Sequence, residues 1–268
     1  MSDTVRVPNV PVALTIAGSD SGGGAGIQAD LKVFQRYHVF GTSVITAITA
    51  QNTQGVTSWE AVSSKLVRAQ LECVAADLRP AAVKSGMLAN QDIVKTIAEG
   101  LKEHALIPYV LDPVMVATSG DLLVNAGTVA SIRERLVPLA TLVTPNLDEA
   151  QVLLEQPVND VSTMERAARA LVDEHGAKAA LVKGGHLPGL EMVDVLYADG
   201  DIQHFRHPRV ETTSLHGTGC TLSAAIAAHL ARGNTLRDAV RDSLDYVHRA
   251  ILSAPALGSG HGPLNHWA

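Results

Sequence analysis

A cysteine stands where a glycine-containing turn meets a helix-forming run of small and aliphatic residues. Residues 214–230 read SLHGTGCTLSAAIAAHL, and Cys220 ends the HGTGC motif. The first N–H groups of a helix lack partners within the helix and carry partial positive charge, so this turn suits an anion and favours a thiolate. Two interpretations stay open: a reactive thiol beside an anion site, or a small buried residue at an ordinary helix start.

Other residues that could do chemistry come directly after short apolar runs. A glycine-rich loop, GSDSGGGAG, begins at Gly18, and further runs end in or precede Gln51, Asn52, Asp112, Asn146 and Lys183. Parallel sheets bind ligands beyond the carboxyl ends of their strands, so we expect these residues to meet on one rim. The loop does not match GxGxxG in register, no acidic residue closes a second strand about 20 residues later, and the chain has no GxxxxGK[ST] motif.

The elements that would position these residues alternate along the chain. Helix-type segments such as 26–39 and 91–104 follow short β-type runs. The predicted strands are residues 11–18, 43–49, 81–85, 109–112, 142–144 and 179–183. This alternation predicts an α/β fold built on a mostly parallel sheet flanked by helices.

Local signals add a hairpin and a capped helix. Residues 192–205 contain two alternating segments around DGD, which predicts an antiparallel hairpin at the sheet edge. Ser162 and Glu165 have capping-box spacing, and Gly176 stands where that helix would end. No linker divides the chain, so we expect residues 1–268 to form a single domain with a flexible N-terminal segment at 1–10.

Composition argues against several kinds of partner. Aromatic residues make up 3% of the chain and the net charge is −6, which disfavours binding to nucleic acid. No apolar stretch approaches the ~20 residues of a membrane helix, and the N-terminus lacks a signal-peptide core. Two cysteines, Cys73 and Cys220, are too few for a disulfide scaffold. We therefore expect a soluble cytoplasmic protein that does not bind membranes and that acts on a small molecule.

Seven motifs occur in an order that resembles the hydroxymethylpyrimidine/phosphomethylpyrimidine kinases of thiamine biosynthesis, within the ribokinase-like superfamily. They are AGSDSGGGAGIQADLK, VITAITAQNTQGV, VKSGM, LDPVMVATSGD, TPNLDEA, VKGGH and HGTGCTLSAAIAAHLARG. The resemblance runs from about residue 11 to the C-terminus. It implies a ribokinase-like fold that transfers the γ-phosphoryl group of ATP, with Mg²⁺, to the hydroxymethylpyrimidine and then to its monophosphate. Relatives are commonly dimers, which implies a homodimer.

The resemblance also implies roles for single residues at the phosphate end of the site. Cys220 would be the catalytic base, with the helix end lowering its thiol pKa towards neutrality, and Gly217, Thr218 and Gly219 would form an anion hole. Lys183 would reach the ATP phosphates. Nucleotide-binding roles fall to Asn146 and Thr213, and metal-binding roles to Glu149 and Asp112. The plain alternatives are a surface lysine at 183 and first-turn helix acids at 148 and 149.

The substrate pocket implied by the resemblance contains Asp30, Gln51, Met87 and Val114. The Gln51 amide offers a donor and an acceptor, as an aminopyrimidine edge requires. Each residue also has a plain alternative: a helix-dipole acid for Asp30, a surface loop residue for Gln51, and core packing for Met87 and Val114.

The chain departs from the family's pattern at two positions. Relatives often have lysine in place of Thr118 and Ser259, so neither position is credited with a phosphate-binding cation.

Two rival functions stay open. A pyridoxal or pyridoxine kinase would share the fold and the phosphate machinery. A non-enzymatic vitamin-binding protein would keep the pocket but would not need Cys220, Lys183 and the acidic group together.

Overall fold

A single nine-stranded sheet runs through the protein in the computed structural model, which describes residues 10–115 and 124–268. The strands are β1 (Val12–Ser19), β2 (Phe40–Asn52), β3 (Gly55–Ala61), β4 (Ala82–Ser85), β5 (Tyr109–Leu111), β6 (Leu142–Val143), β7 (Ala179–Val182), β8 (Glu191–Ala198) and β9 (Asp201–Pro208). Their order is β3-β2-β1-β4-β5-β6-β7-β8-β9. The six central strands, β2, β1, β4, β5, β6 and β7, pair in parallel with their neighbours. The edge strands pair antiparallel: β3 at one edge, and β8 and β9 at the other.

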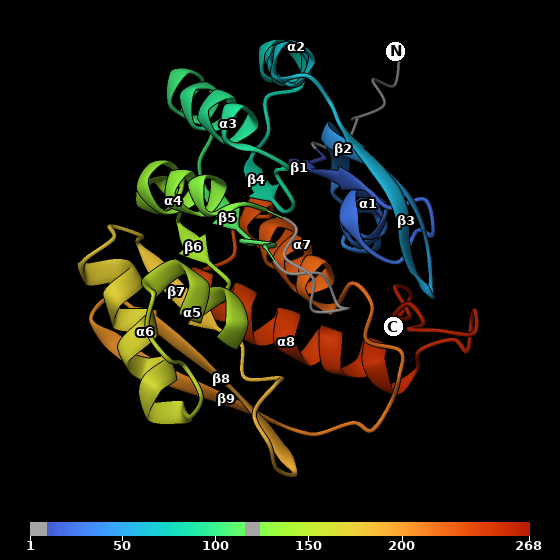
Figure 1. Cartoon of the computed structure of the whole chain (residues 1–268), viewed down its shortest axis with the longest axis vertical. Coiled ribbons are helices and arrows are strands. Elements are labelled where there is room, and N and C mark those ends of the chain that lie inside the picture. Colours follow the sequence, from blue (N-terminus) through green and yellow to red (C-terminus); the bar gives the residue numbers. More distant parts are fainter. Residues whose placement is uncertain (1–9, 116–123) are drawn as a thin grey trace, which may run out of the picture.

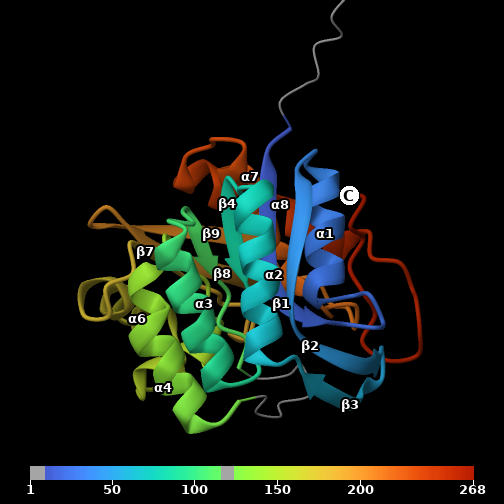
Figure 2. The ribbon, with the colours of Figure 1, turned by 90° about the horizontal axis from the view of Figure 1, so that it is seen from above.

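Helices cover both faces of this sheet (Figures 1 and 2). The elements are α1 (Gly26–Arg36), α2 (Ser64–Asp77), α3 (Gln91–Glu103), α4 (Ala126–Arg135), the short 3₁₀ helix η1 (Val137–Leu139), α5 (Leu147–Leu154), α6 (Val161–Asp173), α7 (Thr218–Ala231) and α8 (Leu236–Leu252). One buried cluster packs the helices α2, α3, α4, α5 and α6 against one face of the sheet. A second cluster packs α1, α7 and α8 against the other face.

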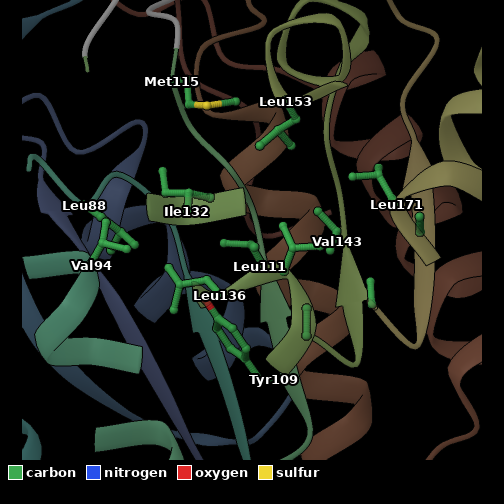
Figure 3. Packing of buried hydrophobic residues seen from close by; sticks show 14 of the residues in the cluster. Leu88, Val94, Tyr109, Leu111, Met115, Ile132, Leu136, Val143, Leu153 and Leu171 are labelled. Carbon is green, nitrogen blue, oxygen red and sulfur yellow. The ribbon is translucent and has the colours of Figure 1, made fainter. Parts of the chain in front are cut away.

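The central strands supply side chains to both clusters because alternate residues point to opposite faces. Leu111 lies in the first cluster, among Ile132, Val143 and Leu153 in Figure 3. Its neighbour Val110 lies in the second cluster. A strand buried on both faces is therefore apolar throughout, which is why short continuous runs predicted these strands correctly.

The predicted fold class is confirmed, including the edge hairpin. β8 and β9 pair antiparallel, and their turn residues Asp199 and Gly200 have φ values of 54° and 78°. Such left-handed values are typical of a type I′ turn, for which Asp-Gly is a favoured pair. The sequence did not predict β3, because all seven of its residues are exposed and it has no buried apolar alternation.

The predicted start of α6 was wrong. The helix is capped by Asp160, whose side chain accepts a hydrogen bond from the Thr163 N–H, while the Thr163 hydroxyl accepts one from the Asp160 N–H. The capping box therefore begins two residues before Ser162 and does not use Glu165. The predicted cap at Gly176 was also wrong, because α6 ends at Asp173 with Glu174 as its C-cap, and Gly176, with a left-handed φ of 82°, lies in the segment beyond.

Some predictions fall on residues that the structure does not describe. The N-terminal segment 1–10 lies outside the described residues except for its last residue, Val10, and Thr118 also lies outside them. Among the described residues, no helix has the length and apolar character needed to cross a membrane.

Candidate active site

Except for Asn52, which is not part of the wall, the predicted rim residues meet around one cavity of about 460 Å³ at the carboxyl ends of the parallel strands. The elements bring together the loop after β1, the end of β2, the segments after β4, β5, β6 and β7, and the turn before α7. Of the residues predicted for the site, the cavity is lined by Gln51, Met87, Asp112, Val114, Asn146, Glu149, Lys183, Gly217, Thr218, Gly219 and Cys220. Asp30 and Thr213 are not part of its wall.

The turn before α7 depends on a glycine. Gly217 is the N-cap of the helix and has a φ of 83°, and a Cβ at this position would collide with the carbonyl of Gly24 in the first glycine loop. Only glycine combines this left-handed conformation with such close packing. No described side chain caps α7, and although the Thr218 N–H donates to the Leu215 carbonyl at 3.3 Å, the next N–H groups, of Gly219 and Cys220, remain available to an anion at the cavity wall.

Cys220 lies in the first turn of α7 and is half-buried on the cavity wall. Burial raises the pKa of its thiol to about 11, although the positive charge of Lys84 and the backbone N–H of Gly26 act in the opposite direction. The prediction of a thiol pKa lowered towards neutrality was therefore wrong, because desolvation outweighs the charge of the helix end.

Asp30 is placed beneath the cavity instead of on its wall. Its carboxylate lies 2.9 Å from the Lys84 ammonium and accepts a 2.6 Å hydrogen bond from the Thr15 hydroxyl, and the side chains of both charged residues are fully buried. Burial lowers the pKa of Lys84, but the charge of Asp30 outweighs this and leaves the pKa raised. The sequence reasoning gave Lys84 no role, although a cation inside the short apolar strand β4 was a signal for a buried partner.

A second charged group surrounds Lys183, directly after β7. Its ammonium lies 3.1 Å from Oδ1 of Asp112 and 3.8 Å from Oε2 of Glu149. Gly219 of the α7 turn faces this group, since a Cβ there would lie 3.1 Å from the same ammonium. The lysine therefore stands between two carboxylates and the helix end, which is a position from which it can contact phosphate oxygens.

Asn146 and Glu149 form a reciprocal capping box at the start of α5. The Asn146 side chain accepts the Glu149 N–H at 2.9 Å, and the Glu149 carboxylate accepts the Asn146 N–H at 2.8 Å. Burial, opposed by Lys183 and reinforced by Asp112, raises the pKa of Glu149 to about 7. This local structure holds the carboxylate at the cavity wall.

The carboxylates of Asp112 and Glu149 fit part of a magnesium site. Mg²⁺ is usually held in kinases by one or two carboxylates, with water and substrate phosphates completing its shell. Within residues 10–115 and 124–268, no three His, Cys, Asp or Glu side chains are grouped to hold a metal by themselves. The donor set therefore fits an ion that arrives with a phosphate ligand.

At the other end of the cavity, Gln51 lies among residues that the sequence reasoning missed. Asp20 accepts hydrogen bonds from the backbone N–H groups of Gly22, Gly24 and Ala25, and from His216 at 2.9 Å. Burial opposes ionisation, but these hydrogen bonds hold the pKa of Asp20 below its usual value. The first glycine loop is thus wrapped around a carboxylate of the chain itself.

Arg209 organises another part of the wall. Its guanidinium donates to the carbonyls of Gly185 and Gly189, both at 2.8 Å, and to the carbonyl of Leu187. These contacts hold the loop after Lys183. Thr213 is exposed and Ser259 accepts a 2.7 Å hydrogen bond from Gln54, so neither lies on the wall of the cavity.

Solved structures identify the class of this protein. The chain aligns with a Bacillus subtilis pyridoxal kinase in an ADP complex at a TM-score of 0.90 and 36% identity, over 96% of this chain and 97% of that chain. It aligns with the phosphomethylpyrimidine kinase of Clostridium difficile at a TM-score of 0.81 and 41% identity, over 90% and 99%. The protein is a ribokinase-like phosphotransferase that uses ATP and acts on a small molecule.

Sequence comparison narrows this class to one family. The family model described as phosphomethylpyrimidine kinase matches residues 20–265. A hydroxymethylpyrimidine/phosphomethylpyrimidine kinase of Rhizobium meliloti is 52% identical over 260 residues, which cover 96% of this chain and 97% of the relative. The thiamine biosynthesis bifunctional protein ThiED of Geobacter sulfurreducens is 46% identical, over 94% of this chain and 51% of that protein. The chain belongs to the phosphomethylpyrimidine kinase family, which confirms the resemblance.

Proposed function

We propose that the protein transfers the γ-phosphoryl group of ATP to 4-amino-5-hydroxymethyl-2-methylpyrimidine, and then to its monophosphate, in thiamine biosynthesis. The observation that carries this proposal is the position of the HGTGC segment. Its His216 contacts Gln51 at one end of the cavity, and its Gly219 faces Lys183 at the other. Cys220, in the same segment, also lines the cavity, and in this proposal the hydroxymethyl and phosphoryl groups meet beside it.

The first transfer follows from this arrangement. The hydroxymethyl oxygen attacks the γ-phosphorus, the bond from that phosphorus to the β–γ bridging oxygen breaks, and ADP leaves. The hydroxyl proton passes to Sγ of Cys220, which acts as its thiolate. Lys183 and the free N–H groups of α7 stabilise the charge on the phosphoryl oxygens.

Mg²⁺ is part of the proposal, with Asp112 and Glu149 as its protein ligands and Asn146 as the residue that orients Glu149. The ion would neutralise phosphate charge. Lys183 lies within 4 Å of both carboxylates, so its positive charge offsets part of the repulsion between them before the ion arrives.

Pyridoxal is the rival substrate, because structural neighbours include pyridoxal kinases. That of Staphylococcus aureus, in complex with AMP-PCP and pyridoxal, aligns at a TM-score of 0.90 but at 32% identity, over 97% of this chain and 95% of that chain. Incubation with Mg-ATP and either compound, followed by mass spectrometry, separates the two. We expect the pyrimidine to gain one and then two phosphoryl groups. Phosphorylation of pyridoxal alone overturns the assignment.

We further propose that the chain is a single kinase domain and that it works as a homodimer in the cytoplasm. The exposed edge strand β3, which presents Val56 and Trp59 to solvent, supports association. Light scattering coupled to gel filtration tests the dimer, and a mass of one chain would contradict it.

A further inference from the structure

Three polar side chains from distant parts of the sequence meet on the cavity wall. Nε2 of His216 lies 2.9 Å from Oδ2 of Asp20 and 3.3 Å from the amide nitrogen of Gln51. All three residues line the cavity. Of these three, only Gln51 has an expected role, in contacting the aminopyrimidine, and the pairing of Asp20 with His216 has none.

The contact with Asp20 shows which ring nitrogen of His216 carries a hydrogen. Asp20 is 3% exposed, and although burial opposes ionisation, the hydrogen bond with His216 and those from backbone N–H groups hold its pKa below the usual value. An ionised carboxylate only accepts hydrogen bonds, so Nε2 of His216 must carry the hydrogen. This holds for the neutral Nε2–H tautomer and for the imidazolium alike. Nε2 is therefore a donor and cannot accept a hydrogen bond from the Gln51 amide.

Thr49, the other neighbour of the Gln51 amide, favours the same orientation of that amide. The Thr49 hydroxyl lies 2.9 Å from the carbonyl of Ser19 and 3.2 Å from Oε1 of Gln51. Its single hydrogen goes to the closer carbonyl, which leaves an acceptor facing the amide. With Nε2 of Gln51 towards His216, two donors would face each other and two acceptors would face each other. A 180° rotation about the Cγ–Cδ bond removes both conflicts: the amide N–H donates to Thr49, and Oε1 turns towards the Nε2–H of His216, whose single hydrogen it shares with the closer Asp20 carboxylate.

His216 itself has little freedom to turn away. Its backbone N–H donates to the carbonyl of Gly262, and its side chain is 14% exposed. The ring rests on Gly24, where a Cβ would lie 2.6 Å from the ring carbon Cδ2. The donor is therefore in place before any ligand binds.

We propose that the Asp20–His216 pair is a positioning unit that holds the Gln51 amide with Oε1 towards His216 and Nε2 towards Thr49. The inference rests on the proposed function and on the role expected of Gln51 from the sequence, as the side chain that contacts the aminopyrimidine. After these two bonds, the amide keeps one free lone pair on the His216 side and one free N–H on the Thr49 side. The pair thereby sets the order of donor and acceptor that the cavity recognises.

Two ligands that differ in this order provide the test. The 4-amino ring presents an amino donor beside a ring-nitrogen acceptor, whereas the 4-oxo analogue presents a carbonyl acceptor beside a ring N–H donor. Calorimetry measures the affinity of each for the parent protein, His216→Ala, His216→Phe and His216→Gln. His204→Ala is the matched control, because His204 forms a 2.8 Å contact with Glu165 and does not line the cavity.

We expect the parent protein and the His204→Ala control to prefer the amino ring by about 10- to 100-fold, as for one or two misplaced hydrogen bonds. His216→Ala and His216→Phe free the amide to rotate, so the preference falls to a few-fold. His216→Gln supplies a new side-chain N–H and restores the preference. In steady-state assays of the alanine and phenylalanine variants, KM for the pyrimidine should rise more than KM for ATP.

Several outcomes count against the inference. If His216→Phe keeps the parent preference, the ring acts only by packing, and the positioning role is overturned. The same holds if His216→Gln discriminates no better than His216→Ala, or if His216→Ala discriminates as well as the parent. These results leave the proposed function intact. A parent protein that binds neither pyrimidine but binds pyridoxal overturns the proposed function, and this inference with it.

Discussion

The role of Cys220 as the base predicts a steep dependence of phosphoryl transfer on pH. Burial raises the thiol pKa to about 11. At pH 8 the thiolate is then roughly one part in a thousand, and each further pH unit multiplies it about tenfold. Between pH 8 and 10 we expect the rate of transfer to rise about tenfold per unit. This range lies above the pKa of about 7 for Glu149, so that carboxyl is already ionised throughout.

Single-turnover rapid-quench measurements isolate the chemical step from product release. Cys220→Ala removes the base, so we expect the rate to fall about 10²- to 10⁴-fold and the slope with pH to disappear. Cys220→Asp should recover part of the rate with a flat profile, because a carboxyl pKa ordinarily near ~3.9 is far below this range. Cys73→Ala is the matched control, since Cys73 is exposed on α2 and should change neither the rate nor the slope.

A flat parent profile between pH 8 and 10 would refute the reasoning about the thiol. A folded Cys220→Ala enzyme with a single-turnover rate near that of the parent would falsify the assignment of the base. In either case Cys220 would be a small residue at the start of α7 and no more.

Three further substitutions test other parts of the site. Gln51→Leu should weaken pyrimidine binding about 10- to 100-fold in calorimetry while ADP binding stays unchanged, and equal pyrimidine affinity would remove Gln51 from the pocket. Lys183→Met should lower single-turnover transfer far more than pyrimidine affinity, because it removes the cation at the phosphates, and parent-like transfer at saturating ATP would make it a surface lysine. Lys84→Met should lower the free energy of unfolding in urea by about 3–5 kcal/mol, because it leaves Asp30 buried without its partner. Lys95→Met, which breaks only an exposed pair, should change it by under about 1 kcal/mol, and equal losses for the two lysines would contradict the argument.

Much of the fold could be predicted from the sequence because its strands are buried on both faces. A short continuous apolar run such as that of β7 indicates a buried strand when a helix-type segment precedes it. The same pattern located Gln51, Asp112 and Lys183, since a polar residue that follows a buried strand lies at the rim of a parallel sheet. The hairpin followed from the Asp-Gly turn and the alternating segments on either side of it.

What could not be predicted depends on contacts between distant residues. Asp30 has the spacing of a pocket or helix-dipole residue, and only the position of Lys84 shows that it is buried in an ion pair. The pKa of Cys220 depends on how much water the folded chain excludes, which no local motif records. His216 stands in a recognised motif, yet its partner Asp20 is 196 residues away.

Because Asp20 and His216 are so far apart in the sequence, the site is assembled only after the segment that contains His216 and Cys220 has been synthesised. Every described strand of the sheet has been synthesised by Pro208, before either His216 or Cys220 leaves the ribosome. A nascent or truncated chain that stops there contains the glycine loop, Gln51 and Lys183, but it lacks the thiol of the site and the partner of Asp20. A contact of such long range is also costly to form early in folding, because closing the long loop between its ends costs conformational entropy. We therefore expect a chain that stops at Pro208 not to consume ATP through this site, whatever part of the sheet it assembles.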